Sequence, residues 1–143
     1  MRTIRCHAEI AAPQAELFAL TQDYAARPLW DPIHGEVRVH DDGRVWYRSK
    51  DGRTMTVRYV SHEAPERVAM TMVEGPFIFH RFSGAWIFKS LGERRTEVTF
   101  NYSFELRGLL SIGEGFVAWR LTRTMEARLA GLKTYAESSA RGK

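Results

Sequence analysis

Hydrophobic and polar residues alternate at the start of the chain. Ile4, Cys6, Ala8 and Ile10 share one side of residues 3–10, and polar residues occupy the other side. A period of two is typical of a strand with one buried face. We therefore predict that the chain opens with a half-buried strand.

The period changes to that of a helix after this strand. Pro13 suits the first position of a helix, and the apolar side of the next segment recurs at i, i+3, i+4 and i+7: Leu17, Leu20, Thr21 and Tyr24. This spacing predicts a short helix over residues 13–22. Pro28 and Pro32 then bracket a segment that must be a loop or a brief broken helix.

Turn signals divide residues 35–106 into about six strands. These signals are Asp41-Asp42-Gly43, Lys50-Asp51-Gly52, Ala64-Pro65-Glu66, Gly75-Pro76 and Leu91-Gly92-Glu93. The last strand alternates most regularly, with one face formed by Val98, Phe100, Tyr102, Phe104 and Leu106. Such alternation predicts an antiparallel sheet with one covered and one wet face.

A long helix is predicted at the end of the chain. Its apolar stripe is Val117, Leu121, Met125, Leu129, Leu132 and Ala136. Ser111 and Glu114 have the spacing of a capping box, and the helix should run from about residue 115 to 138, roughly 35 Å. One helix cannot cover a flat seven-stranded sheet. The sheet must therefore curl around it, and the space left where the sheet bends away is a candidate pocket.

Length, charge and cysteine content narrow the class of protein. The chain has 143 residues, of which 44% are hydrophobic and 27% charged, as in one globular domain over residues 1–143. The net charge of +4 comes from scattered Lys and Arg, which does not favour a DNA partner. Cys6 is the single cysteine, so neither an intrachain disulfide nor a thiolate zinc site is expected. No signal peptide or membrane span is evident, which favours the cytoplasm.

Four features resemble a known family. They are the junction Ala11-Ala12-Pro13-Gln14-Ala15-Glu16-Leu17-Phe18, the turn Trp30-Asp31-Pro32, the hairpin of Ser83-Gly84-Ala85-Trp86-Ile87-Phe88 with Thr96-Glu97-Val98-Thr99-Phe100, and the long terminal helix. Together they resemble the START-like, Bet v 1-like helix-grip superfamily of polyketide cyclase/dehydrase and lipid-transport proteins, over nearly the whole chain. Gly75-Pro76-Phe77 before Gly84-Ala85-Trp86 is also similar to the coenzyme Q-binding branch.

The resemblance implies an α+β helix-grip fold. A curved seven-stranded antiparallel sheet would surround the long C-terminal helix, with two short helices after the first strand. It also implies a hydrophobic ligand without fixing which one, because a shared fold does not establish a shared activity. We expect no cofactor and no metal.

The predicted periods orient side chains toward the pocket. If Trp86 and Phe88 point inward, Phe82 and His80 follow them unless a bulge lies near Gly84. The candidate ligand-binding residues are Trp30, Tyr59, Met72, Phe77, His80, Phe82, Trp86, Phe100, Tyr102, Phe116, Trp119, Arg120 and Arg123. On the long helix we expect the first two turns to set ligand specificity and Leu129 and Leu132 to set stability.

His80, Glu74 and Tyr102 are the candidate catalytic residues. The strand period turns Glu74 inward with Met70 and Met72, and a buried His or Glu could move protons. Each of these polar groups could equally lie at a rim or pair with a neighbour. The five histidines form no HExxH pattern, the glycines lack Walker spacing and no GxSxG elbow exists.

Three functions remain open from the sequence. The first is a carrier or sensor of a lipid, isoprenoid quinone or polyketide-like compound. The alternative is an aromatase/cyclase that acts on a poly-β-ketone in the same cavity. The third, with less support from the scattered charge, is an interaction module that docks on a membrane or RNA. A monomer and a homodimer are both compatible with the sequence.

Overall fold

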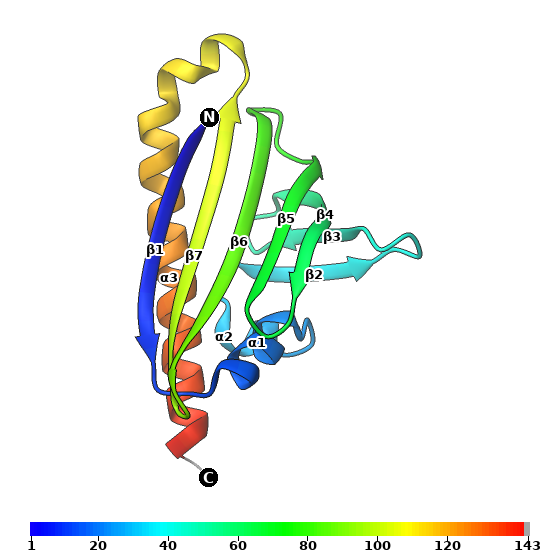
Figure 1. Ribbon diagram of the computed structural model, residues 1–143. Helices are drawn as coiled ribbons and strands as arrows, with labels where there is room; N and C mark the ends of the chain where they lie inside the picture. The colour runs from blue at the N-terminus through cyan, green and yellow to red at the C-terminus, as the bar shows by residue number, and fades with distance from the viewer. Residues whose placement is uncertain (142–143) are drawn as a thin grey trace.

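The computed structural model describes residues 1–141, and the side chains of residues 1–138. Its elements follow the predicted order (Figure 1), and they are β1 (Arg2–Ile10), α1 (Gln14–Gln22), α2 (Arg27–Trp30), β2 (His34–Val39), β3 (Val45–Ser49), β4 (Thr54–Glu63), β5 (Arg67–Glu74), β6 (Phe79–Gly92), β7 (Arg95–Leu106), the 3-10 turn η1 (Gly108–Gly113) and α3 (Glu114–Arg141).

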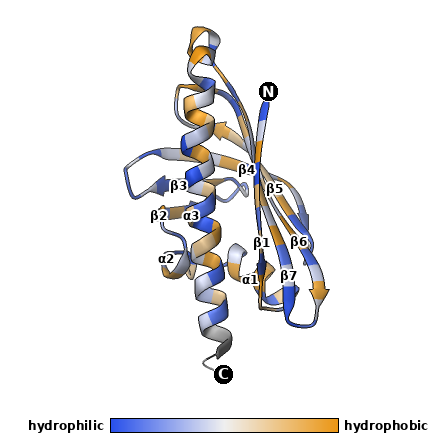
Figure 2. Ribbon diagram, turned by 90° about the vertical axis from the view of Figure 1, so that its left-hand side faces the viewer, coloured by the Kyte–Doolittle hydropathy of each residue, from blue (hydrophilic) through white to orange (hydrophobic). Residues whose placement is uncertain are grey.

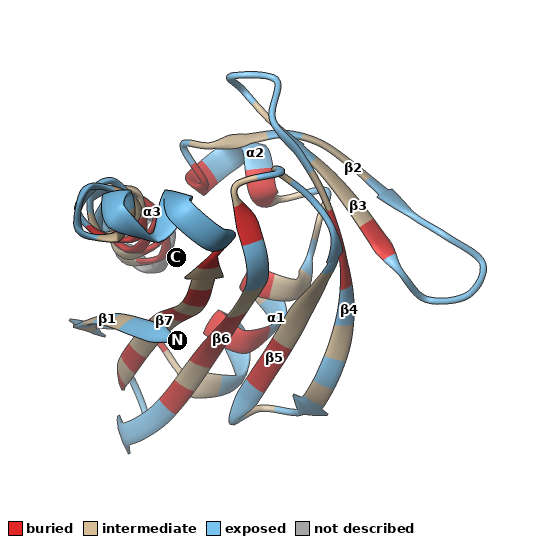
Figure 3. Ribbon diagram, turned by 90° about the horizontal axis from the view of Figure 1, so that it is seen from above, coloured by how far each residue is buried: buried red, intermediate tan, exposed pale blue. Residues whose placement is uncertain are grey.

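The seven strands form one antiparallel sheet in the order β1-β7-β6-β5-β4-β3-β2. Seen from above in Figure 3, the sheet curves from β1 around to β2, and α3 lies on its concave side. Register shifts interrupt several strand pairs, and such bulges bend and twist strands. The α+β helix-grip fold predicted from the sequence is confirmed.

The turn residues explain where the strands end. Gly43 and Gly52 have φ of 89° and 88°, in the left-handed region that glycine adopts without a steric penalty. Their amides donate to the carbonyls of His40 and Ser49, both at 3.0 Å. The two Asp-Gly signals therefore close the β2–β3 and β3–β4 hairpins, as is typical of this dipeptide.

The stripe of α3 is buried from Met125 onward. Met125, Leu129 and Leu132 are at most 4% exposed and pack with Trp86 and Val98 in the main core. The first turns also carry hydrophobic residues (Figure 2), but Phe116 and Trp119 there are exposed. The stripe thus fixes α3 against the sheet mainly through the residues from Met125 onward.

The predicted capping box at Ser111 is not formed. Ser111 lies inside η1, where its carbonyl accepts the amide of Glu114, so α3 begins at Glu114 instead. The Glu114 carboxylate lies 3.8 Å from the Arg2 guanidinium. It therefore contacts β1 rather than the amide of Ser111.

Gly131 marks the closest approach of α3 to the segment after α2. A Cβ atom at this position would lie 2.2 Å from the carbonyl oxygen of Trp30. That distance is far below van der Waals contact, and the obstacle is backbone rather than a flexible side chain. The absence of a side chain at Gly131 thus permits the turn Trp30-Asp31-Pro32 to lie against α3.

Gly131→Ala should destabilise the fold. Overpacking costs about 1–3 kcal/mol, which exceeds the gain of up to about 1 kcal/mol from replacing a helical glycine. Gly115→Ala is the matched control, because its Cβ would meet nothing closer than Arg2 Nη1 at 4.0 Å. Denaturant unfolding should give a lower free energy of unfolding for Gly131→Ala and an equal or higher one for Gly115→Ala. Equal stability of the two variants would contradict the close approach.

Candidate functional site

A cavity of about 500 Å³ lies between the concave face of the sheet and α3. Much of its wall is apolar, formed by Met55, Val57, Met70, Met72, Ile78, Phe79, Phe82, Trp86, Phe100, Val117 and Leu121. Its exposed lining residues mark the opening, and they include Arg48, Lys50, Asp51, Arg53, Phe116 and Arg120. The buried charged residues Arg27, Asp31 and Arg128 form a polar region of the wall.

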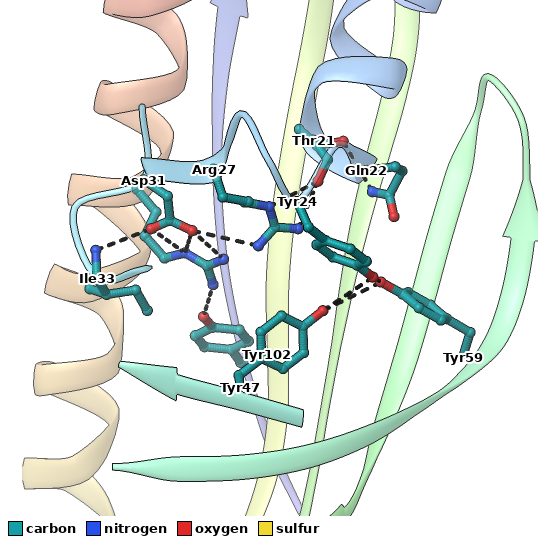
Figure 4. A network of polar contacts seen from close by, with 10 residues as sticks. Thr21, Gln22, Tyr24, Arg27, Asp31, Ile33, Tyr47, Tyr59 and Tyr102 are labelled. Carbon is teal, nitrogen blue, oxygen red and sulfur yellow. Dashed lines mark hydrogen bonds and ion pairs between the residues drawn. The ribbon is translucent and has the colours of Figure 1, made fainter. Parts of the chain in front are cut away.

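Asp31 and Arg128 form a buried ion pair within this wall. Arg128 Nε donates to both carboxylate oxygens of Asp31 at 3.2 Å, and Nη2 donates to Oδ2 at 2.9 Å. The amide of Ile33 also donates to Asp31 Oδ1 at 3.2 Å (Figure 4). Since Asp31 follows α2 and Arg128 lies on α3, the pair joins two segments distant in sequence.

Tyr102 extends this network onto the sheet. Arg128 Nη1 donates to the Tyr102 hydroxyl at 2.6 Å, and the guanidinium lies over the Phe100 ring, 4.9 Å from its centroid. Gly84, opposite Tyr102 on β6, leaves the space that this ring occupies, because a Cβ there would lie 3.2 Å from Tyr102 Cδ1. Since the hydroxyl oxygen accepts from Arg128, its own proton can be donated to a further acceptor.

Arg27 is the second buried cation of the cavity wall. Its Nε and Nη2 donate to the carbonyl of Thr21 at 2.9 and 2.7 Å, near the C-terminus of α1, where cations are favoured. Its Nη1 lies 3.6 Å from Asp31 Oδ2. The guanidinium also lies 5.4 Å from the Trp30 ring centroid, so Arg27 links α1, α2 and the ion pair.

The protonation states follow from this geometry. Burial opposes the ionised form of Asp31, but Arg128 and Arg27 hold its carboxyl pKa below the ordinary value. Burial also opposes the charge on Arg128, yet Tyr102 and Asp31 raise its pKa. Burial raises the pKa of the Tyr102 phenol against the effect of Arg128. The site therefore holds a carboxylate, a guanidinium and a neutral phenol near neutral pH.

Three tyrosine hydroxyls meet beside Arg27. Tyr24 and Tyr59 are hydrogen-bonded to each other, and the Tyr47 hydroxyl lies 3.4 Å from both (Figure 4). Burial raises the pKa of Tyr59 to about 12, so its phenol is neutral. Only Tyr47 of the three lines the cavity, and the cluster ties β3 and β4 to the segment after α1.

Some of the predicted site residues line the cavity. Its lining includes Met72, Phe82, Trp86, Phe100, Tyr102, Phe116 and Arg120. The inward orientation expected for Tyr102 is confirmed. The role of each residue in ligand binding stays a prediction.

Other predicted site residues lie outside the cavity lining. Trp30 is buried beside Trp86, with ring centroids 6.0 Å apart, and Tyr59 belongs to the tyrosine cluster. On the surface, Phe77 is 77% and Trp119 55% exposed. Arg123 is also exposed, and its guanidinium lies 5.2 Å from the Trp119 centroid. These three side chains are therefore not part of the cavity wall.

The expected inward orientation of His80 and Glu74 is wrong, because each lies at a break in the strand period. Phe79 pairs with Leu106 and Arg81 with Glu105, so His80 is the extra residue of a β-bulge and is exposed. A similar shift separates Met72 from Glu74 on β5 and leaves Glu74 exposed. A bulge changes which residues face the cavity.

Four polar residues of the inner cavity wall are among those not selected from the sequence: Arg27, Asp31, Tyr47 and Arg128. A signal for Arg128 exists, since it lies three residues after Met125 and four before Leu132, inside the apolar stripe. A charge at core spacing needs a buried partner. Asp31 carried a signal too, as the acidic residue of the Trp30-Asp31-Pro32 turn, but nothing in the sequence pairs the two.

Two further features are absent from the described residues. Within residues 1–141, no group of three or more His, Cys, Asp or Glu side chains is placed to hold a metal ion. No helix in that range combines the length and apolar character needed to cross a membrane.

Comparison with known proteins gives a family match and many structural neighbours. The sequence model of the family described as polyketide cyclase / dehydrase and lipid transport matches residues 1–137. No curated protein matches the sequence. A START superfamily protein from Mycobacterium smegmatis superposes with a TM-score of 0.81 at 14% identity, over 95% of this chain and 97% of that chain.

Two aromatase/cyclases have the same fold. The Zhui aromatase/cyclase from Streptomyces sp. R1128 has a TM-score of 0.77 at 20% identity, covering 95% of this chain and 93% of that chain. The di-domain ARO/CYC BexL, from the BE-7585A biosynthetic pathway, has a TM-score of 0.81 at 20% identity. That match covers 94% of this chain and 46% of BexL. At these identities the neighbours show the fold alone.

Asp31→Asn should destabilise the protein near neutral pH. It removes the counter-charge of buried Arg128, a loss that costs about 3 kcal/mol or more. Because the folded pKa of Asp31 lies below its ordinary value, the ionised pair contributes fully above about pH 5 and is lost as pH falls below about 4. The difference in unfolding free energy between wild type and variant should therefore shrink on acidification.

Asp41→Asn is the control for this prediction, since Asp41 is exposed and its replacement should change stability by less than about 0.5 kcal/mol. Urea unfolding at neutral and acidic pH measures both variants. A difference for Asp31→Asn that is independent of pH would contradict an ionised pair with a lowered pKa.

Proposed function

Because the chain belongs to the polyketide cyclase / dehydrase and lipid-transport family, we propose that it binds a hydrophobic small molecule in the cavity between the sheet and α3, as a carrier or sensor. The ligand would be a lipid, an isoprenoid quinone or a polyketide-like compound. The observation that carries this proposal is the cavity itself, which has a large apolar wall, one buried polar region and a charged opening.

The cavity offers the two kinds of contact that such a ligand needs. Its volume of about 500 Å³ lies within the range of small-molecule sites. Burial of an apolar ligand in it would contribute about 25 cal/mol per Å² removed from water. The Tyr102 hydroxyl and the guanidinium groups of Arg27 and Arg128 supply donors for ligand oxygens.

The ligand can be sought directly in purified protein. Native mass spectrometry of gently purified protein, followed by extraction and analysis of released compounds, should reveal a bound hydrophobic molecule. Protein that carries none, and that binds no lipid, quinone or polyphenol added to it, would contradict the proposal.

Filling the cavity should abolish binding without unfolding the protein. Met72 lines the cavity, whereas Val73 is exposed next to it on β5. Met72→Trp should therefore reduce the amount of co-purified ligand at least about tenfold, a loss of about 1.4 kcal/mol. Val73→Trp, with the same added side chain outside the cavity, should keep the wild-type amount. Equal loss in both variants, or in neither, would place the ligand elsewhere.

A second candidate function is aromatase/cyclase activity on a poly-β-ketone in the same cavity. The fold shared with two aromatase/cyclases favours it, as does the neutral phenol of Tyr102 held at 2.6 Å by Arg128. A protonated phenol beside a guanidinium can hydrogen-bond a ketone oxygen and stabilise the negative charge that develops on it during enolisation.

The two functions make different predictions for one pair of variants. If the chain is a cyclase, Tyr102→Phe should lower cyclisation about 100-fold or more, while His80→Ala should leave it unchanged because His80 is exposed. The assay is the product distribution of a reconstituted aromatic polyketide synthase with the protein added. Turnover that survives Tyr102→Phe would exclude this role for the phenol, and no change of products by the wild type would favour the carrier or sensor.

A further inference from the structure

The buried polar region of the cavity carries more positive than negative charge. Arg27 and Asp31 are each 2% exposed, and Arg128 is 9% exposed. Among the described residues that line the cavity, these are the buried charged ones, and they comprise two guanidinium groups and one carboxylate. A buried charge is costly unless another group compensates it.

Asp31 is paired mainly with Arg128. Three of the four short contacts between Asp31 and the guanidinium groups come from Arg128, at 2.9–3.2 Å. The contact with Arg27 Nη1 is longer, at 3.6 Å. The charge of Arg27 thus faces mainly the Thr21 carbonyl at the end of α1, and a helix C-terminus offers only about half a negative charge.

A neutral donor lies next to this excess charge. The Tyr102 hydroxyl accepts from Arg128, which leaves its proton for an acceptor in the cavity. Tyr47 also lines the cavity, but its hydroxyl donates to Tyr24 at 3.4 Å. The region therefore presents donors to the cavity, and an anionic oxygen is the acceptor that would both receive them and balance the charge.

The opening of the cavity also carries an excess of positive charge. Its exposed lining residues include Arg48, Lys50, Arg53 and Arg120, against the single carboxylate of Asp51. Burial lowers the pKa of His34, so this lining residue adds no charge near neutral pH. Glu36, 3.5 Å from Arg48, reduces the excess but does not cancel it. An excess of positive charge at a cavity entrance raises the association rate of anions.

We propose that the ligand of this cavity is an organic acid, whose apolar body lies along the wall of the sheet and whose carboxylate is bound by Arg27, Arg128 and the Tyr102 hydroxyl. The inference rests on the proposed binding function and narrows its ligand class. It favours fatty-acid-like or acidic polyketide-like compounds over a neutral quinone. An arginine fork suits a carboxylate, because two parallel donors match its two oxygens.

Decanoic acid and decanamide form the probe pair that tests this. They have nearly the same shape, and near neutral pH only the acid is charged. Titrations followed by the fluorescence of Trp86 and its neighbours, or by calorimetry, give the dissociation constant of each probe. Wild-type protein should bind decanoate at least about tenfold more tightly than decanamide.

Two variants change the charge of the region in known directions, and a third preserves it. Arg27→Gln removes the excess cation and should remove most of the preference for decanoate, whereas Arg27→Lys should keep it. Asp31→Asn adds one net positive charge and should increase the preference among the molecules that remain folded. Arg123→Gln is the control, because Arg123 is exposed and outside the cavity lining. Circular dichroism verifies the fold of each variant before titration.

The outcomes separate the two proposals. If wild-type protein binds both probes equally, the ligand is not selected as an acid, and the acid inference fails while the apolar cavity function stands. If it binds neither probe at millimolar concentration, the cavity function fails as well. If Arg27→Gln and Arg27→Lys both weaken the two probes equally in folded protein, Arg27 has only a structural role and the inference is overturned. Opposite effects of Arg27→Gln and Asp31→Asn on decanoate alone would support it.

Discussion

The buried ion pair between Asp31 and Arg128 is the interaction on which the site depends. It joins the segment after α2 to the middle of α3, and through the Tyr102 hydroxyl it reaches β7. Gly131 makes this arrangement possible, since it lets the Trp30 carbonyl lie against the helix. Without the pair, a guanidinium would be buried among Trp86 and Phe100 with no counter-charge, a situation that proteins avoid.

The cavity results from the uneven packing of α3. Met125, Leu129 and Leu132 fill the space between the helix and the sheet, whereas Phe116 and Arg120, nearer the start of the helix, lie at the opening. Figure 3 shows the sheet curving around α3, with β4 and β5 farther from the helix than β1 and β7. From Met125 onward α3 therefore stabilises the fold, and its first turns leave room for the cavity.

The same network that stabilises the fold supplies the polar chemistry of the cavity. Most of the hydrogen-bonding capacity of Asp31 is used within the protein, but Tyr102 and Arg27 retain donors toward the cavity side. This dual use explains why family and fold leave the reaction open. A guanidinium beside a neutral phenol can bind an acid, hold a ketone or polarise it, and the choice depends on the ligand that enters.

The sequence by itself determined the architecture. Its periods of two and 3.6, its Asp-Gly turns and the stripe from Leu121 to Ala136 identified the strands, the long helix and the need for a curved sheet, because these features reflect local backbone preferences and one continuous buried face. It also placed Trp86, Phe100 and Tyr102 on the inner face, where the strand period is unbroken.

Tertiary structure alone decided the polar site. Asp31 and Arg128 are 97 residues apart, and their pairing depends on how the α2 segment docks on α3. The bulge at His80 likewise arises from the register of β6 against β7, and one extra residue reverses the side of the sheet that a strand residue faces. Local periodicity predicts neither the ion pair nor the bulge, because both depend on contacts between segments that meet only after the chain has folded.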